Sequence, residues 1–416
     1  MSIFTAASPS NSSDKKIRVM LVDDSAVVRG LMSRWLSTEE NIEIVSRCHN
    51  GLQAVNEVAT VKPTIVILDI EMPEMDGLEA LPLIIKASPQ TRILIASTLS
   101  QRNAEISLTA LAKGAHDYIP KPTTNSDLTT STSFRVDLIT KINALCYGAG
   151  GKAAYTIGRA TPKPLPDGLA GGSASPAVPQ RPLAAPAVRQ AASGVLPVVK
   201  IASSALSDQT VNPANMRKFN RGKPDILCIG SSTGGPRAVQ TVLAEIAPHI
   251  GQIPVVLTQH MPGTFTTVFA SHLDKALPVD VAEAKNGEPL QPGRVYVAPG
   301  ERHLMFKRGA SGIECVLDDG PEVNFCKPAV DNMFMSAQQL FGNRILGVIL
   351  TGMGQDGAAG GKMIADAGGN IFAQDAATSI VWGMPGAAYK SGICAGVYSL
   401  GEIGSKIVKV IKEGSV

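Results

Sequence analysis

The stretch Ile17-Arg-Val-Met-Leu-Val-Asp-Asp24 decides the fold of the first part of the chain, because an apolar, β-branched run ends in two adjacent carboxylates. An amphipathic segment follows as far as Leu36, and further short apolar runs lie at 43–48, 65–70 and 93–97. Strand-length apolar runs that alternate with helix-like segments are typical of a parallel, doubly wound α/β sheet. We therefore expect such a sheet here.

The same alternation resumes at Asp225-Ile-Leu-Cys-Ile-Gly230, with strand-like runs at 254–258, 294–298 and 345–350. The residues in between are rich in Ala, Pro, Gly and Ser, so they cannot bury enough apolar surface to offset the entropy lost on ordering. The predicted fold class is α/β, with two doubly wound parallel-sheet domains joined by a flexible linker. The predicted boundaries are 1–15 for a disordered N-terminal segment, 16–145 and 224–414 for the domains, and 146–223 for the linker.

Composition excludes several classes of protein. The 416 residues carry a formal net charge of +3 without a long Lys/Arg run, so nothing favours nucleic acid or an anionic membrane as a partner. The six cysteines form no CxxC pair, which argues against a zinc ribbon or a disulfide framework. Met1–Ser13 is polar and no run of about 18 apolar residues occurs, so we expect no export and no membrane insertion. The predicted location is the cytoplasm.

Three carboxylates are placed where α/β sheets bind ligands. Asp23 and Asp24 follow one strand-like run and Asp69 ends another, so the three should converge at the carboxyl edge of the sheet. A strand-ending aspartate on its own is more often a cap or a turn former. Clustered carboxylates repel one another, and a hard cation such as Mg²⁺ relieves that repulsion with oxygen ligands. Asp69 then becomes a candidate nucleophile toward a phosphoryl donor.

Two further groups fit a phosphoryl site at this edge. Ser97 and Thr98 end a strand-like run, and Lys121 lies between two prolines after another apolar run. Their hydroxyl and ammonium groups can reach phosphoryl oxygens. Together with the carboxylates they favour a phosphoryl site over aspartates that act only as caps or turn formers.

These motifs, Val22-Asp-Asp-Ser25, Leu68-Asp-Ile-Glu-Met-Pro-Glu-Met-Asp-Gly77 and Lys121-Pro122, resemble the signature of response-regulator receiver domains over about residues 16–145. The resemblance implies that Asp69 accepts the phosphoryl group and that Asp23 and Asp24 serve the metal. It also implies that Lys121 senses the acyl phosphate and that Ser97 is the switch hydroxyl, with its neighbour Thr98 as the alternative.

The second domain begins with a strand that runs into a glycine-rich turn, Gly230-Ser-Ser232-Thr-Gly234-Gly, followed by the helical pattern 238–247. GxSxG spacing is that of a nucleophile elbow, and the free N–H groups at the helix start can stabilise an oxyanion. In a chain rich in Gly and Ser the motif is weak by itself, because a phosphate-binding turn of a nucleotide site has the same composition.

A base and an acid follow two later strands. His260 comes just after 254–258, and Asp356 follows 345–350, so serine, histidine and aspartate should meet at one sheet edge. Their order differs from that of α/β hydrolases, so that fold is not assumed. His303 is the one competitor for a place near the site. The remaining histidines are expected to be structural or solvated: His49, His116, His249 and His272.

The flanks of these residues resemble the catalytic domain of chemotaxis protein-glutamate methylesterases over about residues 224–414. The matching motifs are Gly230-Ser-Ser-Thr-Gly-Gly235, Gln259-His-Met-Pro262, Val297-Ala-Pro-Gly300, Pro328-Ala-Val-Asp331 and Leu350-Thr-Gly-Met-Gly-Gln-Asp-Gly357. The resemblance implies Ser232 as nucleophile, His260 as base and Asp356 as its orienting acid. The family's serine directly precedes Thr-Gly-Gly, which selects Ser232 over Ser231. Ala329 and Gln355 depart from the commoner Ser and Asn.

The family hydrolyses glutamate methyl esters on methyl-accepting chemoreceptors, and many members also deamidate receptor glutamines. Ester hydrolysis then needs no cofactor, Mg²⁺ serves the receiver alone, and a sensor histidine kinase of the chemotaxis type is the implied phosphodonor. The backbone N–H groups after Ser232 and near Met353 are candidate oxyanion donors. The resemblance also suggests that an unphosphorylated receiver packs over the esterase cleft until Asp69 is phosphorylated.

Two other classes of protein remain as alternatives. The second domain could bind DNA or a partner without catalysis, but no helix-turn-helix with clustered basic residues follows the linker. It could also bind a nucleotide through Gly230–Gly235, but that run lacks the lysine of a P-loop.

Overall fold

A computed structural model describes residues 16–122, 132–147, 211–310 and 312–416. The predicted disordered segment 1–15 and most of the predicted linker lie outside these residues. Among the described helices, none combines the length and the apolar character needed to cross a membrane.

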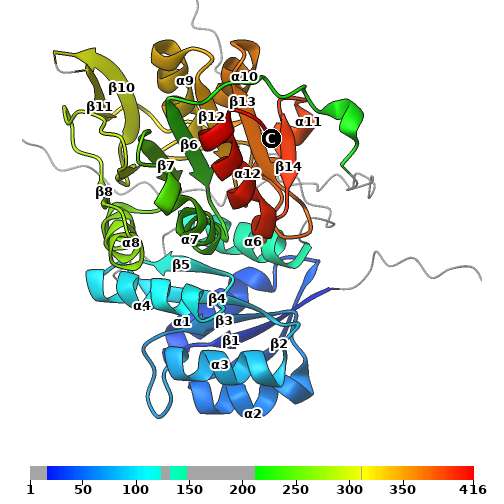
Figure 1. Ribbon diagram of the computed structural model, residues 1–416. Coiled ribbons are helices and arrows are strands. Elements are labelled where there is room, and N and C mark those ends of the chain that lie inside the picture. Colours follow the sequence, from blue (N-terminus) through cyan, green and yellow to red (C-terminus); the bar gives the residue numbers. More distant parts are fainter. Residues whose placement is uncertain (1–15, 123–131, 148–210, 311) are drawn as a thin grey trace, which may run out of the picture. The chain divides into compact units, whose positions relative to one another are not determined.

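The first domain contains a five-stranded parallel sheet with the strand order β2-β1-β3-β4-β5 (Figure 1). Its strands are β1 Ile17–Val22, β2 Ile42–Cys48, β3 Ile65–Asp69, β4 Arg92–Thr98 and β5 Asp117–Lys121. Its helices are α1 Ala26–Leu36, α2 Gly51–Val61, α3 Gly77–Ala87, α4 Gln101–Ala112 and α6 Thr132–Tyr147. The order reverses at β1, so the ends of β1 and β3 form the switch point at which α/β sheets bind ligands.

Local sequence explains why these helices start where they do. Ser25, Asn50 and Asp76 each accept a hydrogen bond from a backbone N–H of the first turn of α1, α2 and α3. Such caps satisfy N–H groups that have no partner within the helix. Strand β3 is buried on both faces, as its continuous apolar run predicts.

The second domain contains a seven-stranded parallel sheet with the order β14-β13-β12-β6-β7-β9-β8. Its strands are β6 Ile226–Ser231, β7 Val255–Gln259, β8 Val281–Glu283, β9 Val295–Val297, β12 Ile345–Ile349, β13 Asn370–Gln374 and β14 Gly396–Tyr398. Its helices are α7 Gly235–Ile246, α8 Gly263–Ala276, α9 Val330–Phe341, α10 Ala358–Asp366, α11 Met384–Lys390 and α12 Leu400–Glu413. An antiparallel hairpin, β10 His303–Gly309 and β11 Gly312–Asp318, stands apart from this sheet.

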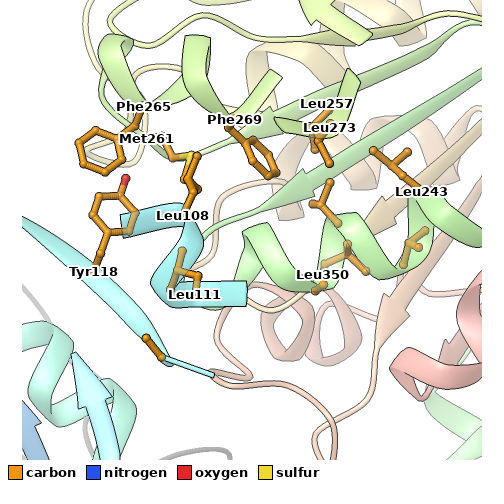
Figure 2. Packing of buried hydrophobic residues seen from close by; sticks show 14 of the residues in the cluster. Leu108, Leu111, Tyr118, Leu243, Leu257, Met261, Phe265, Phe269, Leu273 and Leu350 are labelled. Carbon is orange, nitrogen blue, oxygen red and sulfur yellow. The ribbon is translucent and has the colours of Figure 1, made fainter. Parts of the chain in front are cut away.

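Helices cover both faces of the second sheet. Leu227 and Leu257 face the apolar sides of α7 and α8, and Figure 2 shows Leu257 with Leu243, Phe269 and Leu273 from these helices. Alternate residues of β6 face the other way, so Ile226 and Cys228 belong to a separate cluster with α9 and α10. Both domains therefore have the predicted parallel α/β fold, and the strands through the middle of each are buried.

Residues at the end of the predicted linker bond to the second domain. The backbone N–H of Asn212 donates to the Tyr389 hydroxyl at 2.6 Å, and that of Arg217 donates to the Cys394 carbonyl at 2.8 Å. Gly222 donates to the carbonyl of Gly414 at 2.9 Å. This stretch is thus part of the second domain's surface, although its sequence predicts linker.

Candidate functional sites

The acidic cluster of the first domain forms at the ends of β1 and β3, as predicted. One carboxylate oxygen each from Asp23, Asp24 and Asp69 lies within 4.8 Å of the others. Lys121 reaches in from β5, and its Nζ lies 2.7 Å from Asp69 Oδ1 and 3.1 Å from Asp23 Oδ2. Asp23 and Asp69 are buried, whereas Asp24 is exposed. Three oxygen ligands around one point fit a hard divalent cation such as Mg²⁺.

The charges of this cluster are strongly coupled. Burial raises the pKa of Asp69 to about 6, Lys121 opposes that rise, and Asp23 adds to it. Burial lowers the pKa of Lys121, but Asp69 and Asp23 outweigh burial and raise it. The lysine therefore stays protonated. The carboxylates of the cluster still outnumber this one positive charge, at a largely buried position. A bound cation would offset that excess charge.

Gly77 shows why the acidic motif ends in glycine. A Cβ at this position would lie 2.0 Å from the carbonyl oxygen of Asp69, a distance that no side chain tolerates. Its N–H donates to the carbonyl of Ile70 at 2.9 Å, which closes the loop back onto the end of β3. The glycine thereby lets α3 start directly against the candidate phosphoacceptor.

The two candidate switch hydroxyls both point toward α4. Ser97 Oγ lies 3.1 Å from Ser107 Oγ, and Thr98 Oγ1 accepts a hydrogen bond from Asn103 Nδ2 at 2.5 Å. Within the described residues, neither hydroxyl bonds to Asp69 or Lys121. The structure does not bring Ser97 to the phosphoryl site in this conformation, and the choice between Ser97 and Thr98 stays a prediction.

In the second domain, β6 and β7 bring the predicted nucleophile and base together. Ser231 pairs with Gln259 in the parallel register, so Ser232 and His260 are the next residues on neighbouring strands. Gln259 Nε2 donates to the carbonyls of Ser232 at 2.9 Å and His260 at 3.3 Å. This amide holds the two backbones at a fixed separation.

The structure separates the two adjacent serines. Ser231 is fully buried, and its hydroxyl donates to Gln259 Oε1 at 2.6 Å. This hydroxyl is therefore not available to attack a substrate. Ser232 is half-buried, and among the described residues its hydroxyl has no hydrogen-bond partner. A free hydroxyl suits a nucleophile awaiting substrate, which favours Ser232 on grounds independent of any resemblance. No hydrogen bond joins it to His260 in the described chain, as is common in enzymes without substrate.

The turn after Ser232 has the conformation that the GxSxG motif needs. Gly234 precedes α7 with φ of +73°, a left-handed value that glycine adopts without strain. Ser232 N donates to the carbonyl of Thr351 at 3.0 Å, and a Cβ on Gly352 would lie 2.9 Å from Ser232 Cβ. The turn after β12 thus packs directly on Ser232 and brings Met353 to the site.

Candidate oxyanion donors lie on these two turns. Within the described residues, the backbone N–H groups of Thr233 and Met353 have no hydrogen-bond acceptor. Two free N–H groups beside a serine hydroxyl can stabilise negative charge on a carbonyl oxygen under attack.

His260 and Asp356 form the hydrogen bond that the sequence predicts. His260 Nε2 lies 2.8 Å from Asp356 Oδ2, so Nδ1 is the ring nitrogen left for chemistry. Burial alone would lower the pKa of His260, but the hydrogen bonds with Asp356 and Cys326 raise it. A paired carboxylate of this kind fixes the tautomer and stabilises the imidazolium that forms when the base takes a proton.

Asp356 accepts hydrogen bonds from five donors at once. Its Oδ2 accepts from His260 Nε2 and, at 2.6 Å, from the backbone N–H of Val330. Its Oδ1 accepts from Asn324 Nδ2 at 3.0 Å, Asp331 N at 3.1 Å and Gly357 N at 3.0 Å. Burial would raise the pKa of Asp356, but the bonds from His260 and from α9 lower it. The carboxylate is held charged in a single orientation.

The same bonds explain the departure at Ala329. Ala329 is the N-cap residue of α9 and has no side chain able to cap it. Asp356 satisfies the first N–H groups of α9 instead, from a different part of the chain. Gln355 is exposed, so its departure from the commoner Asn changes no buried contact.

His303, the competing histidine, is the first residue of β10 and has a structural role. Its Nδ1 accepts from the backbone N–H of Ala329 at 3.1 Å, and its Nε2 lies 2.9 Å from the carbonyl oxygen of Pro321. Both ring nitrogens are therefore occupied, and the ring holds 321–329 in place. His260 differs in that its Nδ1 has only a 3.5 Å contact with the Cys326 thiol, which makes it the better candidate base of the two.

Sequence reasoning missed two residues of this loop. Asn324 Nδ2 bridges Asp331 Oδ2, at 2.9 Å, and Asp356 Oδ1, and so separates two buried carboxylates. Cys326 Sγ lies 3.5 Å from His260 Nδ1. Both lie a few residues before the Pro328-Ala-Val-Asp331 motif, and that motif was the one sequence feature that pointed to this loop. Spacing alone does not show which residue of the loop faces the site.

One sheet carries an acidic site with a lysine, and the other carries a serine, a histidine and an aspartate. This combination is typical of a response regulator whose effector domain is an esterase. Family models agree with this class: residues 19–133 match the response regulator receiver domain, and residues 227–407 match the CheB methylesterase. The chain belongs to the protein-glutamate methylesterase/protein-glutamine glutaminase family.

Several relatives match nearly the whole chain. The protein-glutamate methylesterase/protein-glutamine glutaminase of group 2 operon from Bradyrhizobium diazoefficiens is 46% identical, over 98% of this chain and 98% of its own length. The Rhodopseudomonas palustris protein of the same description is 44% identical, over 99% and 98%. A relative from Rhodospirillum rubrum is 42% identical, over 98% and 99%.

Proposed function

We propose that this protein is a phosphorylation-regulated esterase that hydrolyses glutamate methyl esters on methyl-accepting chemoreceptors and deamidates receptor glutamines. The observation that carries the proposal is the His260–Asp356 pair at the sheet edge where Ser232 follows the neighbouring strand, with a hydroxyl that has no partner among the described residues. Family membership supplies the substrate class. The Pro328-Ala-Val-Asp331 segment supports the reading as well, because its backbone fixes Asp356.

The proposed reaction proceeds through an acyl-enzyme. His260 Nδ1 takes the proton of Ser232 as the serine oxygen attacks the ester carbonyl carbon, and returns it to the departing methoxide, which leaves as methanol. Water then attacks the acyl-enzyme with His260 again as base, releasing the glutamate carboxylate and restoring Ser232. With a glutamine substrate the leaving group is ammonia. Asp356 stabilises the imidazolium in each step.

The N–H groups of Thr233 and Met353 are the proposed oxyanion donors. They lie on the turns after β6 and β12, which are packed against each other at Ser232. A donor of this kind contributes about 3 kcal/mol to stabilising the transition state in comparable enzymes. The proposed ester hydrolysis uses Ser232, His260 and Asp356 and needs no cofactor.

The proposed control lies in the receiver. Asp69 accepts a phosphoryl group from a sensor histidine kinase, and Asp23, Asp24 and Asp69 would hold Mg²⁺, whose charge would offset that of the phosphoryl oxygens. Lys121 is already 2.7 Å from Asp69 and can pair with the acyl phosphate. Ser97 remains the proposed switch hydroxyl. The proposed location is the cytoplasm, and the proposed partners are the chemoreceptors and the sensor histidine kinase, not nucleic acid.

Methanol release from methyl-labelled receptor membranes tests the function. The full-length protein, with Mg²⁺ and a small phosphodonor, should release methanol, and Ser232→Ala and His260→Ala should each abolish release. The double variant should lose no more than either single variant, because the two act as one unit. Ser231→Ala is the matched control and should retain most activity. Equal losses in the two serine variants would contradict the nucleophile assignment.

A further inference from the structure

Cys326 lies against the catalytic base on the side opposite its carboxylate. Its Sγ is 3.5 Å from His260 Nδ1, while Asp356 Oδ2 is 2.8 Å from Nε2 of the same ring. One potential ligand atom from each of these residues lies within 4.8 Å of the others. A thiol and an imidazole nitrogen so close together are donors that suit a thiophilic cation.

The thiol is held in this place by a constrained turn. Val323 and Cys326 exchange backbone hydrogen bonds of 3.1 and 2.9 Å, and the residues between them, Asn324 and Phe325, have φ of +53° and +61°. A left-handed phenylalanine is uncommon, because its Cβ crowds the backbone in this conformation. Asn324 then ties the turn to Asp356. The position of Cys326 is thus fixed by the same carboxylate that fixes His260.

The other five cysteines offer no comparable site. Burial raises the pKa of the Cys48 thiol to about 11 and those of Cys146, Cys315 and Cys394 to about 12, and it also raises that of Cys228. Metal ligation needs the thiolate, so these thiols are poor ligands. Within the described chain, Cys326 alone among the cysteines belongs to a ligand cluster.

The spacing of the two nearest donors fits zinc. With bonds of about 2.3 Å to sulfur and about 2.0–2.1 Å to nitrogen, a tetrahedral Zn²⁺ separates the two donor atoms by about 3.5 Å. The observed distance between Cys326 Sγ and His260 Nδ1 is 3.5 Å. Asp356 on the opposite ring nitrogen is the outer carboxylate that commonly orients a zinc-bound histidine.

We propose that Cys326 and His260 Nδ1 bind Zn²⁺, with Asp356 orienting the imidazole from Nε2, and that the bound ion switches the esterase off. Zn²⁺ takes the lone pair of Nδ1, Cys326 loses its thiol proton to solvent, and water fills the remaining positions. No electron is transferred, and a chelator reverses the step. The base then cannot accept the Ser232 proton. Inhibition rests on the proposed esterase function, whereas binding of the ion does not.

Cobalt substitution tests the binding directly. Full-length protein in excess Mg²⁺, which occupies the receiver's carboxylates, is titrated with Co²⁺ and then with Zn²⁺. One equivalent of Co²⁺ should produce a thiolate-to-cobalt charge-transfer band that Zn²⁺ displaces. Cys326→Ser should lose the band, and Cys146→Ser, which removes another half-buried thiol, should keep it. A band that persists in Cys326→Ser, or its absence from the unmodified protein, would overturn the site.

Methanol release measured in the same samples tests the inhibition. Zn²⁺ at one equivalent above the chelator capacity should lower the rate at least tenfold in the unmodified protein and in Cys146→Ser, and a chelator should restore it. In Cys326→Ser the concentration of Zn²⁺ needed for the same fractional loss should rise at least tenfold. An enzyme that binds cobalt through Cys326 but keeps its rate would refute the inhibitory role. If no esterase activity existed, the cobalt band would still report the site.

Discussion

Replacing Asp356 with Asn should reduce both stability and catalysis, because this carboxylate accepts five hydrogen bonds and an amide cannot. If the new NH₂ group takes the place of Oδ1, it faces the N–H groups of Asn324, Asp331 and Gly357. If it takes the place of Oδ2, it faces His260 and the N–H of Val330. The second orientation creates fewer conflicts, so we expect it.

In that orientation the backbone N–H of Val330 loses its acceptor in a buried place, which costs about 1–3 kcal/mol. For a domain of this size each kcal/mol shifts the melting temperature by about 2–4 °C. The amide also donates to Nε2, so His260 carries its proton on Nδ1 and cannot act as base. Loss of the right tautomer lowers kcat about 10⁴-fold in serine proteases, and we expect a similar fall here.

Scanning calorimetry and methanol release on the same full-length preparations separate these effects. Asp356→Asn should melt at least about 2 °C lower and lose nearly all activity. Ser232→Ala should lose its activity without a shift, because the serine hydroxyl has no partner within the described residues to lose. An equal melting temperature for Asp356→Asn and the unmodified protein would refute the argument that the five hydrogen bonds accepted by Asp356 stabilise the fold.

Three further predictions concern regulation and the base. Asp69→Asn should take up no phosphate from a small phosphodonor with Mg²⁺ present, and an acid-labile phosphoryl group remaining on that variant would require another acceptor. Because the bonds to His260 raise its pKa and the base must be neutral, kcat/KM should fall as the pH drops through that pKa. Cys326→Ala, assayed with a chelator, removes one contact that raises the pKa of His260, so the fall in kcat/KM should occur at lower pH. An unchanged pH profile would show that this contact does not form in solution. A fragment beginning at Val211, which keeps the bonds made by 212–222, should exceed the basal rate of the unphosphorylated full-length protein if the receiver inhibits, and a slower fragment would point to activation or targeting instead.

The sequence by itself determined the class of fold and most of the candidate site. Strand-length apolar runs and the residues that end them are local features, and the ends of parallel strands meet at one edge of a sheet. Asp23, Asp69, Ser232 and His260 could therefore be placed from position alone. The three-residue strands β8 and β14 could not, because so short a segment has no readable periodicity.

Only the tertiary structure decided how the site residues bond. His260 and Asp356 are 96 positions apart, and the choice of His260 over His303 depends on which ring nitrogens the folded chain already occupies. The approach of Cys326 to Nδ1 depends on a turn held by Asn324 across 32 residues. Strand ends are encoded by neighbouring residues, whereas hydrogen-bond partners are set by where distant loops meet, and that is a property of the packed molecule.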